Sequence, residues 1–388
     1  MTENFRSSRH IVDAANVFAQ GIRQRIKKTP IVSMSRENGS VKVTQHTSAC
    51  LYEPVAEDVE HHSGGTTCVL TRTNEEAVIL LALLSKRGHP AKLIQSADSF
   101  RFWNLAEARC FIKAIDAGIA KLKSPTITDE LWHEAKRLTS AKYDNSTALP
   151  YLQQCLRTFE QTNRTKYYSD LCEFIFESPV EDFCEVSKED IVVSTIHKAK
   201  GREFDNVYML VSGQQFVSDE ELRQYYVAMT RAKQTLSIHT TGNSSSNNGL
   251  SDNVFSKMIA LCSSIDSLVT DTETYKMPDE IVLQLTHKDI WLDYSKPYKR
   301  EILSLRSGEP LAFCGDGFSI PNTDKQIVKL SKKMKDLLAE WEKKGYQVTS
   351  VTIRFIVAWK PKEAPEEESE TAVLLAEMTL HRTSKIIC

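Results

Sequence analysis

The chain has 388 residues, which is enough for two or three domains with cores of their own. A formal net charge of −2 excludes a strongly basic chain, so any site for a polyanion must be a local basic surface. The 9 cysteines contain no Cys-x-x-Cys pair, which argues against a zinc ribbon or an iron–sulfur cluster. With no signal peptide and no apolar run of membrane-spanning length, the cytoplasm is the expected compartment.

Helical and strand patterns alternate along the first part of the chain. The expected elements are a helix within residues 4–20 with Asn4 and Ser7 as caps, strands over 41–45 and 67–73, a helix capped by Asn74 that stops at Gly88, a strand over 91–94 and a helix over 104–117. This β-α alternation predicts a parallel sheet covered by helices.

Residues 119–188 break this alternation. They are polar, mostly helical in tendency and acidic at their end, and we interpret them as an insertion. The alternation then resumes with strands over 191–196 and 206–212, a helix over 219–232, a strand over 235–241, a flexible loop over 241–249 and a helix over 252–264.

The character of the sequence changes again near residue 275. Short strand-like runs follow, with one amphipathic helix over 327–345 between them. The acidic stretch 360–370 separates the last two runs, and a solvated loop is its simplest interpretation.

The segment STIHKAKGREFDNVYML, residues 194–210, carries the densest polar chemistry. It predicts a buried strand followed by a polar loop that holds Thr195, His197, Lys200, Gly201 and Glu203. Loops after parallel strands are where such sheets bind ligands, the histidine and lysine suit phosphates, and the glutamate could accept from a ribose hydroxyl. Taken alone, the segment is also compatible with a loop of solvated charges.

The second segment is EELRQYYVAMTRAKQTLSIH, residues 220–239. Its helix ends at Thr230 and Arg231, beside the next strand. An arginine at that position can reach the nucleotide of a neighbouring domain, where its planar fork stabilises charge on the γ-phosphate. Taken alone, a salt-bridged surface arginine is the alternative.

Together, the two segments resemble motifs V and VI of superfamily 1 DNA helicases of the UvrD/Rep kind. The matching patterns are T-x-H-x-x-K-G-x-E-F and, further along, Y-V-A-M-T-R-A-K. Three more segments resemble the same family: NFRSS (4–8) its motif IV, VLTRTNEEA (69–77) a later motif, and SFRFWNLAEARCFIKAI (99–115) the stretch before its inserted 2B domain. The resemblance covers roughly residues 1–265, although Arg202 stands where the family usually has leucine.

The resemblance implies an α/β fold, namely the second RecA-like domain of a helicase that moves 3′ to 5′ on single-stranded DNA. It implies ATP contacts from Gly201, Glu203, Arg6 and Arg231, with Arg6 and Arg231 as the catalytic arginines. It implies DNA contacts from Arg72, Asn74, Thr195, His197 and Lys200. It also implies ATP and Mg²⁺ in a complete site, and no metal ligands in this chain. The expected domains are a RecA-like part over 1–118, a reduced helical 2B-like insertion over 119–188, the second RecA-like part over 189–265 and an α+β accessory domain over 275–388.

The phosphate-binding half of such an enzyme does not appear in this sequence. None of the 14 glycines is followed by lysine, as a Walker A loop requires, and no Asp-Glu pair follows a hydrophobic strand. We therefore expect no ATPase activity without a first RecA-like domain, supplied in a longer protein or in trans. A non-catalytic DNA-binding or regulatory module is the alternative function, and an unrelated phosphate-binding α/β enzyme fits the sheet but not the paired motifs.

Residues 275–388 do not match the usual family tail. They resemble the C-terminal regions of bacterial proteins that join a RecQ-like helicase to a UvrD-like one, and also HIRAN modules, which bind DNA ends. Trp291, Tyr294, Tyr298 and Lys299 could form a stacking and basic surface for single strands, or the aromatic residues could fill a small β core.

Overall fold

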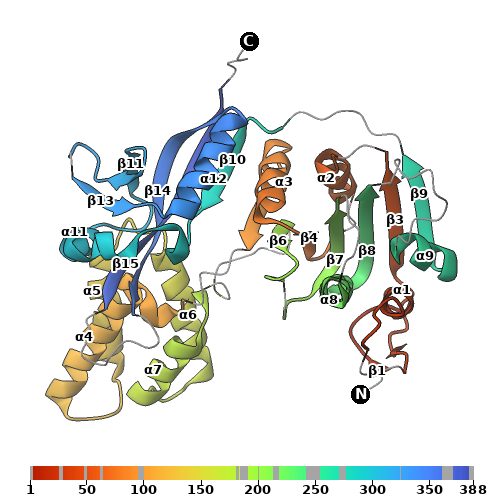
Figure 1. Cartoon of the computed structure of the whole chain (residues 1–388). Coiled ribbons are helices and arrows are strands. Elements are labelled where there is room, and N and C mark those ends of the chain that lie inside the picture. Colours follow the sequence, from red (N-terminus) through yellow and green to blue (C-terminus); the bar gives the residue numbers. More distant parts are fainter. Residues whose placement is uncertain are drawn as a thin grey trace. The chain divides into compact units, whose positions relative to one another are not determined.

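The computed structural model divides the chain into two compact units, shown in Figure 1. One unit comprises Met1–Gln95 with Val186–Pro278, and the other comprises Ser96–Glu185 with Asp279–Cys388. The structure describes residues 3–25, 29–47, 50–61, 64–94, 100–180, 183, 191–199, 201–212, 218–241, 254–270, 277–323, 325–360 and 370–383. Lys200, the 242–249 part of the expected flexible loop and most of the acidic stretch 360–370 lie outside these residues.

The first unit is built on a parallel sheet of seven strands within the described residues, in the order β5-β6-β4-β7-β8-β3-β9. Its strands are β3 (Ser40–His46), β4 (Thr67–Thr71), β5 (Ala91–Ile94), β6 (Ile191–Thr195), β7 (Phe204–Val211), β8 (Ala232–Thr241) and β9 (Ile265–Thr270). The central strands β4 and β6 are buried at every residue, as expected for strands that helices cover on both faces.

Helices cover both faces of this sheet. They are α1 (Arg9–Ala19), α2 (Tyr52–Glu60), α3 (Asn74–Lys86), α8 (Asp219–Met229) and α9 (Val254–Leu261). Helices α1, α8 and α9 share one apolar core with the sheet, and α2 and α3 share another, on opposite sides in Figure 1. Cys68 and Leu70 of β4 belong to the first core, whereas Val69 belongs to the second. The sequence-based prediction of a parallel α/β sheet with helices on both faces is therefore confirmed.

The helix ends differ in detail from the sequence-based expectation. Asn4 does not cap α1; its Oδ1 accepts from the backbone N–H groups of Arg6 at 2.8 Å and Ser7 at 2.9 Å, in a turn before the helix. Asn74 is the first residue of α3, and Thr73 is its N-cap. A two-stranded parallel pair, β1 (Glu3–Asn4) with β2 (Val32–Ser33), lies beside this turn.

The second unit combines helices with an antiparallel sheet of six strands in the order β10-β15-β14-β11-β12-β13. Its strands are β10 (Glu280–Gln284), β11 (Pro310–Phe313), β12 (Gly317–Ser319), β13 (Gln326–Lys329), β14 (Tyr346–Trp359) and β15 (Thr371–Arg382). Its helices are α4 (Ala106–Leu122), α5 (Asp129–Lys142), α6 (Leu149–Thr162), α7 (Tyr168–Glu177), α10 (Leu292–Ser295), α11 (Lys299–Ser304) and α12 (Lys332–Lys343), with 3-10 turns η1 (Phe102–Asn104), η3 (His287–Asp289) and η4 (Lys296–Tyr298).

Helix α4 belongs to this second unit, although the sequence analysis grouped residues up to 118 with the parallel sheet. Its apolar side packs on α5, where the rings of Phe111 and Trp132 lie 5.1 Å apart. The segment just before α4 pairs with β14, since Leu105 forms a bridge to Val357. The helical segment 96–185 and the C-terminal sheet thus bury their apolar surfaces against each other. No helix of the described residues is both long and apolar enough to cross a membrane.

Candidate functional site

Two arginines and a glutamate gather at the amino edge of the parallel sheet. Glu203 directly precedes β7 and Arg231 directly precedes β8, and these strands begin side by side, with Phe204 opposite Ala232. Arg6 lies in the segment before α1, and its Nε is 2.5 Å from Oε1 of Glu203. That segment is fixed to the start of β8, because the hydroxyl of Ser7 donates to the carbonyl of Ala232 at 2.8 Å.

Backbone carbonyls orient the Arg231 side chain. Its Nε donates to the carbonyl of Val227 at 3.0 Å, and its Nη1 donates to the carbonyl of Arg202 at 3.3 Å. The first of these carbonyls lies in the last turn of α8, where the helix dipole favours a positive charge. Partial burial lowers the pKa of Arg231, the charge of Arg6 lowers it further, and Glu203 opposes both. Glu203 pairs with Arg6 and its charge also acts on Arg231, so two guanidiniums lie near one carboxylate.

Glu203 lies at the amino edge of the sheet, because it directly precedes β7, whereas the sequence analysis placed its whole loop after a strand end. Strand β6 ends with Thr195 at the carboxyl edge, and β7 begins with Phe204 at the amino edge, because both strands run parallel to β4. Residues 196–203 therefore cross from one edge of the sheet to the other. Gly201 lies in this crossing with φ +90°, a conformation that other residues adopt only with strain.

The residues predicted to contact DNA lie at the carboxyl edge, apart from Lys200, which is not described. Arg72 and Asn74 follow β4, whose last residue is paired with Thr195 of β6. The backbone N–H of Ile196 donates to the carbonyl of Thr71 at 2.9 Å, and Lys198 Nζ donates to Asn74 Oδ1 at 3.0 Å. Arg72, Asn74 and His197 are exposed, whereas Thr195 is only 7% exposed and has little hydroxyl surface to offer.

Glu76 shapes this edge, and the sequence analysis did not single it out. Its Oε2 accepts from the backbone N–H groups of Arg72 at 2.9 Å and Thr73 at 3.0 Å, and its Oε1 accepts from the hydroxyl of Ser212 at 2.9 Å. Thr73 and Glu76 form a capping box at the start of α3. The pattern Thr-x-x-Glu before an apolar run was the available signal for it. Arg72 itself pairs with Glu221 of α8 at 3.5 Å.

The sequence matches the family described as the UvrD-like helicase C-terminal domain over residues 1–119 and 109–243. The chain belongs to this family. Among solved structures, it is similar to the C-terminal domain of a possible DNA helicase from Lactobacillus plantarum, with a TM-score of 0.32 and 15% sequence identity over 69% of this chain and 98% of that one. No curated protein matches the sequence. The expected membership of the UvrD-like helicases, as their C-terminal half, is therefore confirmed.

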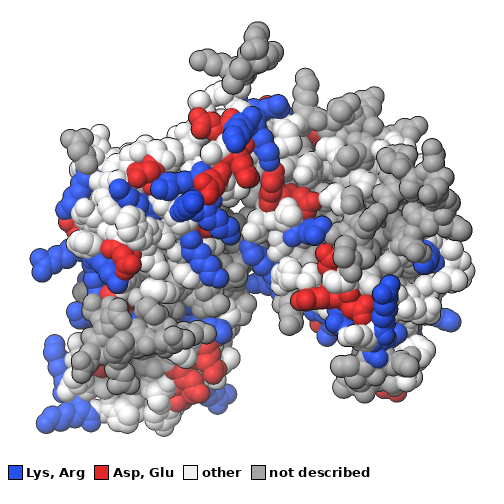
Figure 2. Space-filling model, in the orientation of Figure 1, with Lys and Arg blue, Asp and Glu red and all other residues white. Residues whose placement is uncertain are grey.

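Figure 2 shows the distribution of charge on one face of this UvrD-like chain. Basic and acidic side chains lie interspersed there with uncharged residues, in agreement with the net charge of −2. No broad basic field covers the described part of that face.

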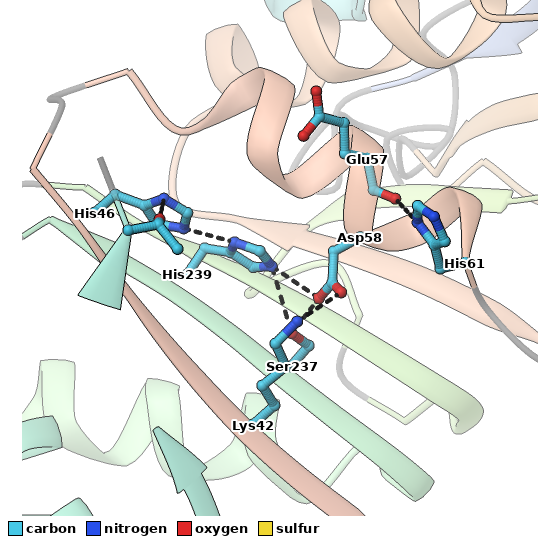
Figure 3. A network of polar contacts seen from close by, with 8 residues as sticks. Lys42, His46, Glu57, Asp58, His61, Ser237 and His239 are labelled. Atoms are coloured by element: carbon cyan, nitrogen blue, oxygen red, sulfur yellow. Dashed lines mark hydrogen bonds and ion pairs between the residues drawn. The ribbon is translucent and has the colours of Figure 1, made fainter. Parts of the chain in front are cut away.

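A buried polar network ties α2 to the strands β3, β8 and β9, and it was not predicted (Figure 3). Asp58 Oδ2 lies 3.0 Å from Nε2 of His239, whose Nδ1 lies 2.9 Å from Nε2 of His46. The Nδ1 of His46 lies 2.9 Å from the hydroxyl of Thr270. A carboxylate only accepts, so His239 donates its Nε2 proton to Asp58, while the donor and acceptor in the other two contacts depend on the tautomers of the imidazole rings.

This arrangement keeps His46 neutral and Asp58 charged. Burial lowers the pKa of His46 to about 4, and the charge of His239 contributes in the same direction. Burial alone would raise the pKa of Asp58, but hydrogen bonds from His239 and Ser237 outweigh it and hold that pKa well below its usual range. Lys42 also donates to Asp58, at 3.0 Å. The network joins four elements of the first unit, and it shares no residue with either of the two sheet-edge clusters.

Proposed function

We propose that this UvrD-like chain supplies the second half of an ATPase site and part of the single-strand path of a 3′-to-5′ DNA helicase or translocase. The observation that carries the proposal is the cluster of Arg6, Glu203 and Arg231. Its surplus positive charge complements a γ-phosphate, and the planar fork of an arginine suits charge that develops there during hydrolysis.

Residues of this chain would act on the nucleotide mainly by orientation and charge. Val227 and Arg202 hold the Arg231 guanidinium through their carbonyls, so little reorganisation is needed when a phosphate arrives. Glu203 reduces the repulsion between Arg6 and Arg231 while no phosphate is present. In this proposal, Gly201 allows the chain to turn so that Glu203 reaches the amino edge.

ATP and Mg²⁺ enter the proposal through a first RecA-like domain, in the same polypeptide or in a separate subunit. The described residues fit the phosphate side of such a site, since Arg6 and Arg231 provide donors to an anion. No group of three or more His, Cys, Asp or Glu suited to a metal ion occurs among the residues that the structure describes. The proposal therefore assigns the magnesium carboxylate and the catalytic base to the first domain.

The carboxyl edge would carry the DNA. Arg72, Asn74 and His197 are exposed there, and Thr195 would shape the strand end. Lys200, which lies outside the described residues, would add a further cation. Phosphate contacts from these cations would position a single strand without reading its sequence. Domain closure on ATP would then move the strand relative to the first domain.

The decisive experiment measures DNA-stimulated ATPase in a complex that contains this chain and a first RecA-like domain. Arg231→Ala and Arg6→Ala should each reduce turnover roughly 10³-fold or more. Arg231→Lys should fail as well, because an ammonium does not reproduce the fork. Arg223→Ala is the matched control, since Arg223 lies on α8, the helix that precedes Arg231, and its side chain is half exposed beside Asp219, at 3.8 Å. Turnover close to the parent rate in Arg231→Ala would refute the assignment.

A further inference from the structure

Three aromatic side chains form a ladder on the surface of the second unit. Trp291, Tyr294 and Tyr298 follow η3 on successive turns, with ring centroids 6.2 Å and 5.6 Å apart. The ladder is anchored to β13, because the backbone N–H of Trp291 donates to the carbonyl of Lys329 at 2.7 Å and the Tyr294 hydroxyl donates to the carbonyl of Gln326 at 3.3 Å. The Tyr294 side chain and the backbone of Trp291 are therefore held against β13.

This ladder does not fill the core of its unit. Trp341 and Tyr346 are each 1% exposed and pack edge to face with ring centroids 5.2 Å apart, whereas Trp291 is 55% exposed and Tyr294 and Tyr298 are half-buried. Exposing so much of an indole ring gives up the stabilisation that burial would provide, which is about 2 kcal/mol or more for a large apolar side chain. The sequence left two interpretations open for these aromatic residues, a stacking surface or the filling of a small β core. The geometry favours the stacking surface.

Cations lie over the rings. Lys329 Nζ is 5.0 Å from the centroid of Tyr294, and Lys325 Nζ is 5.3 Å from that of Tyr298. Each lysine also faces a carboxylate, since Lys329 lies 3.6 Å from Asp316 and Lys325 pairs with Glu301. These ion pairs are at the surface, where they contribute little, so a phosphate can replace the carboxylate at small cost.

We propose that the ladder of Trp291, Tyr294 and Tyr298, with Lys325 and Lys329, binds the unpaired bases of single-stranded DNA. Bases stack on aromatic faces whatever their sequence, and the adjacent lysines match the phosphates that alternate with the bases along a strand. This site lies in the second unit, and none of its residues belongs to the carboxyl edge of the parallel sheet. It therefore does not depend on the ATPase assignment of the proposed function.

A binding titration on the full chain tests the proposal. The probe is a labelled oligothymidine, followed by fluorescence anisotropy. Trp291→Ala should weaken binding about tenfold, which corresponds to about 1.4 kcal/mol and to the loss of one stacked base. Trp291→Phe keeps an aromatic face and should retain most of the affinity. Phe176→Ala is the matched control, because Phe176 is 61% exposed in the same unit but contacts Trp103 instead of the ladder.

The intrinsic fluorescence of the parent should fall when the oligonucleotide binds, since a base stacked on Trp291 quenches its emission, and this change should be absent in Trp291→Phe. Lys329→Ala should reduce the dependence of affinity on salt by roughly 0.7 in log–log slope, the value for one phosphate contact on a single strand. Unchanged far-UV circular dichroism in each variant establishes that the fold is intact.

Two results would overturn the proposal. Parent-like affinity in Trp291→Ala would show that the ladder does not bind DNA. Equal losses in Trp291→Ala and Phe176→Ala would show a non-specific effect.

Arg72→Ala separates the ladder from the carboxyl edge of the parallel sheet. If Arg72→Ala abolishes binding and Trp291→Ala does not change it, the ladder is refuted and the proposed DNA path of the parallel sheet stands. If Trp291→Ala abolishes binding and Arg72→Ala does not change it, only the ladder binds DNA.

Discussion

Acidification should destabilise the first unit through His46. This side chain is 3% exposed, and both ring nitrogens are engaged, one with His239 and one with Thr270. The folded chain holds the pKa of His46 at about 4, whereas its ordinary value is 6.5. The unfolded chain therefore binds a proton at a higher pH than the folded chain does. The stability that neutral His46 supports is fully present above pH 6.5 and is lost as the pH falls from there to about 4.

The size of this effect follows from the two pKa values. A tenfold difference in proton affinity corresponds to about 1.4 kcal/mol, so the whole interval from 6.5 to about 4 is equivalent to about 3 kcal/mol. Between pH 7 and pH 5, about 2 kcal/mol of that should be lost. Asp58 does not contribute in this window, because its lowered pKa affects stability only below its ordinary value of 3.8.

Hydrogen exchange of the β3 and β8 amides measures this loss within the first unit. Between pH 7 and pH 5, the protection factors of these amides should fall in both the parent and His46→Gln. The fall in the parent should be larger, by the equivalent of about 2 kcal/mol in the free energy of opening. His61→Gln is the control, since His61 is an exposed histidine that follows α2. All 5 tryptophans belong to the second unit, so tryptophan emission reports on that unit, whereas the β3 and β8 amides report on the network around His46. An unchanged pH dependence in His46→Gln would show that another group titrates.

Three further predictions concern the sheet edges and helix α3. The purified chain alone should show no DNA-stimulated ATPase in a phosphate-release assay; magnesium-dependent turnover that Arg231→Ala abolishes would contradict this. In anisotropy titrations of oligothymidine at several salt concentrations, Lys200→Ala should lower both the affinity and the salt slope, while Asn74→Ala should leave the slope nearly unchanged. Parent-like binding by Lys200→Ala would argue against the proposed DNA path at the carboxyl edge. Thr73→Ala should destabilise α3 by about 1 kcal/mol through loss of the capping box, and unchanged exchange of the α3 amides would argue against this role.

Hydrophobic periodicity was enough to predict the parallel sheet. The strands β4, β5 and β6 are short apolar runs between turn signals, and α3 shows a helix-forming run that ends before Gly88, so local pattern and observed element agree. The resemblance to motifs IV, V and VI predicted that Arg6, Gly201, Glu203 and Arg231 contact one nucleotide; in the structure Arg6 pairs with Glu203, and their role toward a nucleotide stays a prediction.

Long-range pairing could not be read from local pattern. Helix α4 has an apolar stripe, but nothing in its residues indicates that α5 and the distant β14 cover it instead of the parallel sheet. Asp58, His239 and His46 come from segments that lie far apart in the chain. The sequence of each segment has the pattern of an ordinary half-polar strand or helix. Burial creates the pKa shift of His46, and burial is a property of the packed fold.

The two edge clusters are joined by one short connection, and this has a mechanical consequence. Residues 196–203 begin beside Thr195 at the carboxyl edge and end with Glu203 at the amino edge, next to Arg6. The connection is held at its start by hydrogen bonds from the N–H groups of Lys198 and Ala199 to the Thr195 carbonyl, at 3.0 and 3.2 Å. At its other end, the N–H of Phe204 donates to the carbonyl of Arg231 at 2.9 Å. We therefore expect a displacement of the arginine cluster to act on the connection that also carries His197. A coupling between nucleotide and DNA would need no path through the sheet core, since the backbone of this crossing already connects the two edges.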